Sequence, residues 1–154
     1  MGRFMNHKKL VVALALIATA LILTHLPVSE ADAAASASDF LIEGSTLTKY
    51  RGTDERVTIP DTVEVVGESA FENNQKVQLV VVPKSVKRMD AYVFWGCDNL
   101  EEVVLGKGLT AVDEYAFSGC TGLKQITIPE NVQSIDAQAF AGCTNLTDIY
   151  IPDT

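Results

Sequence analysis

Histidine is scarce in this chain of 154 residues, and an excess of positive charge is absent. The only two histidines, His7 and His25, lie near the N-terminus, and the chain contains three cysteines. The formal net charge of −8 argues against a broad basic surface for binding nucleic acid. Three cysteines are too few for a small disulfide-bonded scaffold. A hydrophobic fraction of 47% with 21% charged residues instead predicts a folded chain of about one domain.

Residues 1–33 have the pattern of a secretory signal peptide. A positively charged leader over 1–9 precedes an uncharged run over 10–23 and a small-residue stretch over 31–37. The run is shorter than the ~20 apolar residues that a membrane-spanning helix needs. The candidate cleavage sites follow Ala33, Ala35 and Ala37, of which we favour Ala33. A retained signal anchor is the alternative.

Removal of this segment changes the charge of the chain. Three basic and two acidic residues leave with it, so that 9 basic and 18 acidic residues remain, a net charge of −9. Both histidines leave as well. We therefore expect a secreted or cell-surface protein that meets a membrane only through an uncleaved signal.

The rest of the chain repeats with a period of 23 residues, and many positions share this spacing. Four phenylalanines lie in one column: Phe71, Phe94, Phe117 and Phe140. Three cysteines form a second column: Cys97, Cys120 and Cys143. Apolar columns run beside them, for example Val57, Val80, Val103, Ile126 and Ile149. A repeat of this length predicts a solenoid in which each period forms one coil.

The repeat unit also resembles a known family. Segments 123–129 (LKQITIP) and 139–146 (AFAGCTNL) are similar to the BspA-like leucine-rich repeats of bacterial cell-surface proteins. The departures are Asn74 for Cys, Gly106 for Pro and Val93 for Ala. The resemblance implies a leucine-rich-repeat solenoid with parallel strands on the concave side and helical turns and irregular returns on the convex side. It also implies protein binding or adhesion.

Each coil is predicted to contain a short strand, a Pro or Gly that ends the strand, and a segment that leads back to the next strand. Alternating apolar residues predict a short strand that pairs in parallel with the next coil, and Pro or Gly ends it. Asp90, Asp113 and Asp136 are interpreted as N-caps of helical turns, and the Phe that follows each one fills the interior. The domain boundaries expected are a linker over 34–38, a hairpin cap over 39–56, and repeats over 57–154.

The repeats comprise four coils and the start of a fifth. The given sequence stops at Ile151-Pro152-Asp153-Thr154, at the beginning of the fifth coil, which would leave an open strand edge and an uncovered Phe140. We expect the chain to be part of a longer protein, with self-association or a minimal complete product as alternatives.

No group of residues predicts catalysis. The cysteines are spaced by 23, have no histidine base and lack the close pairing of zinc ligands, so we interpret them as small buried thiols. The aspartate column is explained by capping, with bridging calcium as an alternative. Glu101-Glu102 and Asp113-Glu114 are interpreted as solvated. We therefore predict that the chain is not an enzyme and has no cofactor or metal.

The outward-facing strand positions are the candidate binding surface. Solenoids use their concave side for extended binding, although β-propensity alone would also place Val and Thr there. The candidate partner-binding residues are Thr58, Val81, Val104, Thr127, Tyr150, Glu102, Gln125 and Asp148.

These observations predict an exported leucine-rich-repeat module for protein–protein interaction or adhesion at the cell surface, with no nucleic-acid partner. The alternative is a structural or targeting arm of a longer protein, which includes the case of an enzyme with a separate catalytic domain.

Overall fold

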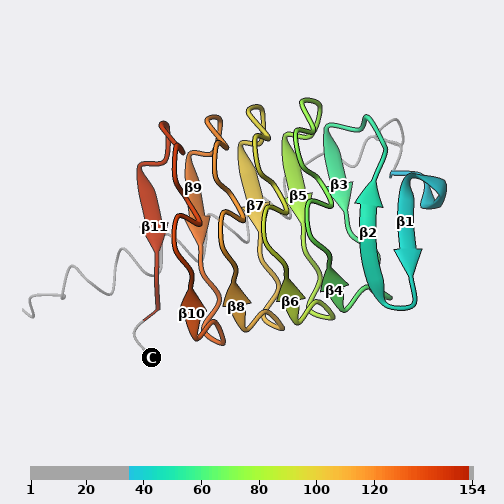
Figure 1. Ribbon diagram of the computed structural model, residues 1–154. Coiled ribbons are helices and arrows are strands. Elements are labelled where there is room, and N and C mark those ends of the chain that lie inside the picture. Colours follow the sequence, from blue (N-terminus) through green and yellow to red (C-terminus); the bar gives the residue numbers. More distant parts are fainter. Residues whose placement is uncertain (1–34, 153–154) are drawn as a thin grey trace, which may run out of the picture. The chain divides into compact units, whose positions relative to one another are not determined.

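The computed structural model describes residues 35–152 (Figure 1). The hairpin and the repeats lie in one unit, Ala34–Thr154. The predicted signal peptide lies outside the described residues. Within residues 35–152, no helix has the length and apolar character needed to cross a membrane.

The described part of the chain begins with a 3-10 helix, η1 (Ala37–Asp39), which is followed by a β-hairpin. Strand β1 (Phe40–Glu43) pairs antiparallel with β2 (Thr46–Tyr50) around a turn at Gly44, whose φ of 63° suits glycine. Strand β2 then pairs in parallel with the first repeat, so the hairpin covers that end of the solenoid as expected.

Two rows of short strands run along the solenoid, as Figure 1 shows. The first row contains β3 (Arg56–Thr58), β5 (Leu79–Val81), β7 (Glu102–Val104), β9 (Gln125–Thr127) and β11 (Asp148–Tyr150). The second row contains β4 (Val65–Val66), β6 (Arg88–Met89), β8 (Ala111–Val112) and β10 (Ser134–Ile135). We number the coils from the residue before each first-row strand: coil 1 is 55–77, coil 2 is 78–100, coil 3 is 101–123 and coil 4 is 124–146.

The third side of each coil is an arch that follows the second strand. The predicted helical turns are not present there: apart from η1, the described residues contain no helix. Tyr92 and Gly96 both have positive φ, 59° and 67°, and the same pair of conformations recurs in each coil. Left-handed residues four apart interrupt a right-handed helix. Backbone N–H groups bond to the next coil instead, as from Phe94 to the carbonyl of Ala116 at 2.8 Å.

The capping role of the aspartates also differs from the prediction. In the described part of the chain no backbone N–H donates to the carboxylate of Asp90, Asp113 or Asp136, because no helical turn is there to be capped. The Asp90 carboxylate instead lies 2.6 Å from the Arg88 guanidinium. The backbone carbonyls of Asp113 and Asp136 accept from Ala116 and Ala139 at 3.3 Å, which closes a turn.

The interior contains the predicted column of phenylalanines. Phe71, Phe94 and Phe117 are fully buried, with ring centroids 5.1 Å and 5.3 Å apart. Tyr50 of the hairpin extends this ladder at one end and Phe140 at the other. Phe140 is half-buried, since only one of its faces meets another ring. The structure thus confirms a leucine-rich-repeat solenoid with parallel strands and an N-terminal hairpin.

Candidate functional site

The exposed side of the first strand row, here called the strand face, carries the candidate residues. Pairing aligns Thr58 with Val81 and Val104, and Thr127 with Tyr150. The outer positions of these strands are exposed or half-buried, and Val104 and Tyr150 are 37% and 50% exposed. The row therefore presents apolar and hydroxyl-bearing side chains to solvent.

A second row on the same face is polar. Glu102 is aligned with Leu79 of coil 2, and Gln125 with Asp148 of the fifth coil. Glu102 is half-buried and the other two polar side chains are exposed. All eight predicted residues thus lie on one face, but their role in partner binding stays a prediction.

The strand face is divided between coils 3 and 4. Strands β3, β5 and β7 form one sheet and β9 and β11 another, so within residues 35–152 no strand pairing joins β7 to β9. Val82 and Ile128 donate backbone hydrogen bonds to the following coil at 2.9 Å, but Leu105, at the equivalent position, does not. We call this boundary the seam.

Gly106 lies at the seam, directly after Leu105. It replaces the proline that ends this strand in the other coils, and a Cβ at this position would lie 2.4 Å from the carbonyl oxygen of Pro83. Gly108 approaches coil 2 equally closely. Both glycines allow the backbone of coil 3 to approach the backbone of coil 2 closely at this point.

Two ion pairs cross the seam. The Lys124 ammonium lies 2.7 Å from the Glu101 carboxylate, and the Lys107 ammonium lies 3.2 Å from Glu130. The third ion pair among the described residues, Arg88 with Asp90, lies within one coil. Both seam pairs are exposed to solvent, so each contributes at most about 1 kcal/mol.

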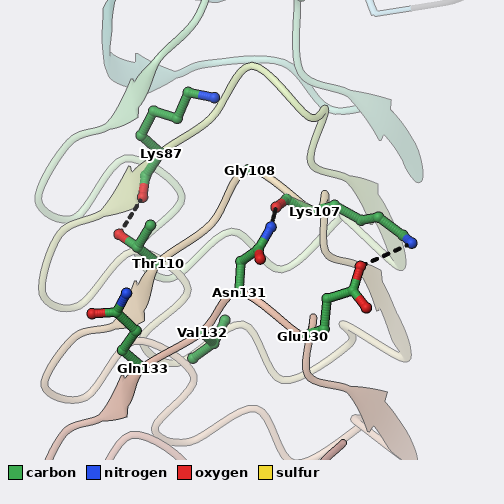
Figure 2. Close-up of a pocket in the computed structure, with 8 residues that line it drawn as sticks. All are labelled: Lys87, Lys107, Gly108, Thr110, Glu130, Asn131, Val132 and Gln133. Atoms are coloured by element: carbon green, nitrogen blue, oxygen red, sulfur yellow. Dashed lines mark hydrogen bonds and ion pairs between the residues drawn. The ribbon is translucent and has the colours of Figure 1, made fainter. Parts of the chain in front are cut away.

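An open recess of about 570 Å³ lies beside the seam (Figure 2). Gly108, which has no side chain, forms part of its wall, together with Lys87, Thr110, Asn131 and Gln133. The Thr110 hydroxyl donates to the Lys87 carbonyl at 3.1 Å, and the Asn131 amide donates to the carbonyl of Lys107 at 2.7 Å. Because these groups already bond to the backbone, the recess is a widening of the coil boundary rather than a preorganised ligand site.

The cysteines are free thiols in the interior. Cys97 and Cys120 are buried, and Cys143 is half-buried. Each Sγ donates to the carbonyl of a phenylalanine in the preceding coil at 3.1 Å. Burial raises the pKa of the Cys97 thiol to about 12, so it is not a thiolate nucleophile at neutral pH. This confirms their interpretation as packing residues.

Asn74 occupies the cysteine position in coil 1. Its carboxamide oxygen accepts from the backbone N–H groups of Lys76 and Val77 at 2.9 and 3.1 Å. The Asn74 side chain thus provides an acceptor for two backbone N–H groups of the turn. Replacement of cysteine by asparagine is therefore compatible with the coil.

The aspartate column is a set of repelling charges. Burial raises the pKa of Asp113, and the carboxylates of Asp90 and Asp136 raise it further. No cluster of three or more His, Cys, Asp or Glu side chains suited to a metal ion occurs among residues 35–152.

One outward feature was missed from the sequence. Tyr92 and Tyr115 stack with ring centroids 5.0 Å apart and an interplanar angle of 7°. Trp95, 39% exposed, lies on the arch that follows Tyr92. The 23-residue spacing of the two tyrosines was the signal that could have revealed this pair.

The parallel strand rows and the recurring arches define the chain as a repeat solenoid. Residues 49–154 match the family model described as BspA type Leucine rich repeat region, in 6 copies. The chain therefore belongs to the BspA-type leucine-rich-repeat family. Solenoids of this kind are typically non-catalytic binding scaffolds.

Solved bacterial structures share this fold. A leucine-rich cell-surface protein of Faecalibacterium prausnitzii is 25% identical with a TM-score of 0.65, over 71% of this chain and 35% of that one. A leucine-rich-repeat protein of Bacteroides capillosus is 28% identical with a TM-score of 0.64, over 75% and 99%. The pneumococcal vaccine antigen PcpA shares the fold at 21% identity and a TM-score of 0.67, over 71% and 28%. No curated protein matches the chain.

Proposed function

We propose that this chain is an exported module that binds a protein at the cell surface through its strand face. The observation that carries the proposal is the register that aligns Thr58, Val81 and Val104 along one solvent-facing sheet. The core is already filled by inward side chains, so packing does not require valines on the outside. Apolar side chains within a polar surround are typical of a surface for partner binding.

Export is supported by the signal pattern of residues 1–33 and by the similarity to a cell-surface protein of Faecalibacterium prausnitzii. The test is expression of the full chain in a bacterial host, followed by N-terminal sequencing of the product outside the cytoplasm. We expect a product that begins at Ala34. A product that keeps Met1 and stays in the cytoplasm would contradict export.

Adhesion is tested on the strand face itself. Purified protein is immobilised on beads, and attachment of intact host and bacterial cells is counted before and after proteolytic removal of surface proteins. We expect protease-sensitive attachment that falls at least fivefold in the Val104→Glu, Tyr150→Glu double variant, because the new charges must be desolvated on contact.

The matched control places the same two charges elsewhere. Thr62 and Ser134 are exposed on the return side of coils 1 and 4, so Thr62→Glu, Ser134→Glu should attach like the unaltered chain. An equal loss of cell attachment in both double variants would show that the effect comes from net charge, and it would contradict the strand-face proposal.

A second candidate function is supported by coverage. The chain covers 35% of the Faecalibacterium protein and 99% of the Bacteroides capillosus protein, and the first of these values is the one expected of a targeting or structural arm of a longer protein. Sequencing of the gene downstream of Thr154 tests this: a continuing frame that encodes a different domain supports it, and a stop codon contradicts it.

A further inference from the structure

The arches of coils 1 to 3 bring aromatic rings and carboxylates together on a surface away from the strand face. Backbone bonds from Ser69 to Ala91 at 3.2 Å and from Tyr92 to Glu114 at 3.1 Å set the arches in register. This register aligns side chains that are 23 residues apart. We call the surface the arch patch, and its members are Glu68, Glu72, Tyr92, Trp95, Glu114 and Tyr115.

The rings of the arch patch are not needed by the core. Phe71, Phe94 and Phe117 already fill the interior at this level. Tyr92 and Tyr115 stack on each other outside it, and both are only half-buried. Trp95 belongs to the same turn as Tyr92, since its N–H donates to the Tyr92 carbonyl at 3.0 Å. Trp95 is 39% exposed, and large apolar side chains exposed in this way often mark interaction sites.

The charge around these rings is negative. Partial burial raises the pKa of the Tyr92 hydroxyl, and the nearby carboxylates of Glu114 and Glu68 raise it further. The basic groups of this neighbourhood are already engaged: the Lys49 ammonium donates to the Ser69 carbonyl at 2.8 Å, and Arg88 pairs with Asp90. Glu68, Glu72 and Glu114 therefore outnumber Lys49, and the patch keeps a net negative charge.

We propose that the arch patch binds a basic polypeptide segment, with arginine or lysine side chains over Trp95 and the tyrosines and paired with the surrounding glutamates. Aromatic faces attract cations, and carboxylates form charge-assisted hydrogen bonds with arginine and lysine. A neutral partner would bury the carboxylates without a counter-charge, which is unfavourable. This surface differs from the strand face, so the proposal stands independently of the proposed function.

Trp95 makes the test direct, because it is the only tryptophan in the chain. A deca-arginine peptide is titrated into the purified protein while tryptophan emission is recorded, and a fluorescein-labelled copy gives the dissociation constant by anisotropy. We expect a saturable change in Trp95 emission whose midpoint agrees with the anisotropy. Glu68→Lys, Glu114→Lys should weaken binding at least tenfold, and Trp95→Ala at least threefold.

The control reverses the same charge on the other face. Glu55→Lys, Glu102→Lys changes the net charge equally on the strand face and should alter the dissociation constant less than twofold. Circular dichroism verifies that each variant is folded. Equal weakening by both double variants, or anisotropy saturation without a change in emission, would overturn the proposal. So would an emission change with neutral glucan oligosaccharides in place of the peptide, which would make the patch a carbohydrate platform.

Discussion

The boundary between coils 2 and 3 and the boundary between coils 3 and 4 have the same interior but different strand faces. At both, phenylalanine rings stack, 5.3 Å apart at the first and 5.2 Å at the second. Pairing of β5 with β7 closes the first boundary, whereas β7 and β9 belong to separate sheets. Two exposed ion pairs join the coils at the second. The comparison teaches that a repeat can keep its core while its surface pairing changes.

The difference has consequences for stability. Nearest-neighbour contacts hold a solenoid together, so each boundary contributes separately. At the seam the return strands β8 and β10 still pair, and the arches still bond, as from Phe117 to Ala139 at 2.8 Å. The seam should therefore open locally on the strand side before the two coils separate.

The largest effect should come from the ring that both boundaries share. Phe117→Ala should lower the free energy of unfolding by about 3–5 kcal/mol, because it leaves a void between Phe94 and Phe140. Urea denaturation measures it. Phe140→Ala is the comparison, and it should cost less because Phe140 is half-buried. An unchanged midpoint for Phe117→Ala would contradict the inward ladder.

A smaller loss of stability should follow from adding a side chain at Gly108, where coils 2 and 3 are in close contact. In Gly108→Ala the new Cβ would lie 2.1 Å from the Lys84 carbonyl oxygen and 2.7 Å from that of Val86. Forced backbone shifts of this kind cost about 1–3 kcal/mol. Thermal unfolding gives the value. Gly44→Ala is the control, since no atom lies within 4 Å and only its φ of 63° is strained. A Gly108 variant as stable as the unaltered chain would argue against tight contact between coils 2 and 3.

The seam itself should be visible in amide hydrogen exchange. The Leu105 amide should exchange at least tenfold faster than that of Val82, which donates to the Val104 carbonyl at 2.9 Å. Nuclear magnetic resonance measures both rates in one sample. Equal protection of the two amides would show that β7 and β9 are paired in solution.

Lys124→Gln should lower stability by about 0.2–1 kcal/mol at low salt, because it removes an exposed pair across the seam. The loss should vanish in 1 M salt, where charges are screened. Arg88→Gln, which breaks a pair within coil 2, should leave Leu105 exchange unchanged, while Lys124→Gln should accelerate it. Equal acceleration by both variants would remove the link between this pair and the seam.

The smallest effect concerns Asp113. Its pKa is raised in the folded state by burial and by the charges of Asp90 and Asp136. A raised carboxyl pKa means that the folded state binds the proton more tightly, so stability falls as pH rises from 3.8 through the folded pKa. Asp113→Asn should therefore slightly raise the melting temperature at pH 7 and flatten this dependence. A lower melting temperature at pH 7 would reverse the assigned sign.

Much of the fold follows from spacing alone. Residues 23 apart, such as Phe94 and Phe117, are predicted to be neighbours, and they are. The outward positions of Val104 and Tyr150 follow from strand alternation in the same way. The helical turns were predicted wrongly because aspartate before an apolar run suits an N-cap, whereas Tyr92 and Tyr115 take left-handed conformations that no helix tolerates.

The candidate surfaces were predicted less completely. The tyrosine pair follows the period, but its outward position depends on how the arch turns, which spacing does not reveal. Gly106 is visible in the sequence as a departure from proline, whereas the close approach of its backbone to Pro83 is visible only in the structure.

The sequence by itself determined which residues stack along the axis, since a fixed period makes equal positions neighbours. It also determined that thiols and phenylalanine rings fill the interior. Only the tertiary structure decided where the sheet breaks and which rings meet solvent. The physical reason is that the period fixes which residues are neighbours, whereas local backbone angles and the hydrogen bonds between coils decide which strands pair and which side chains face solvent.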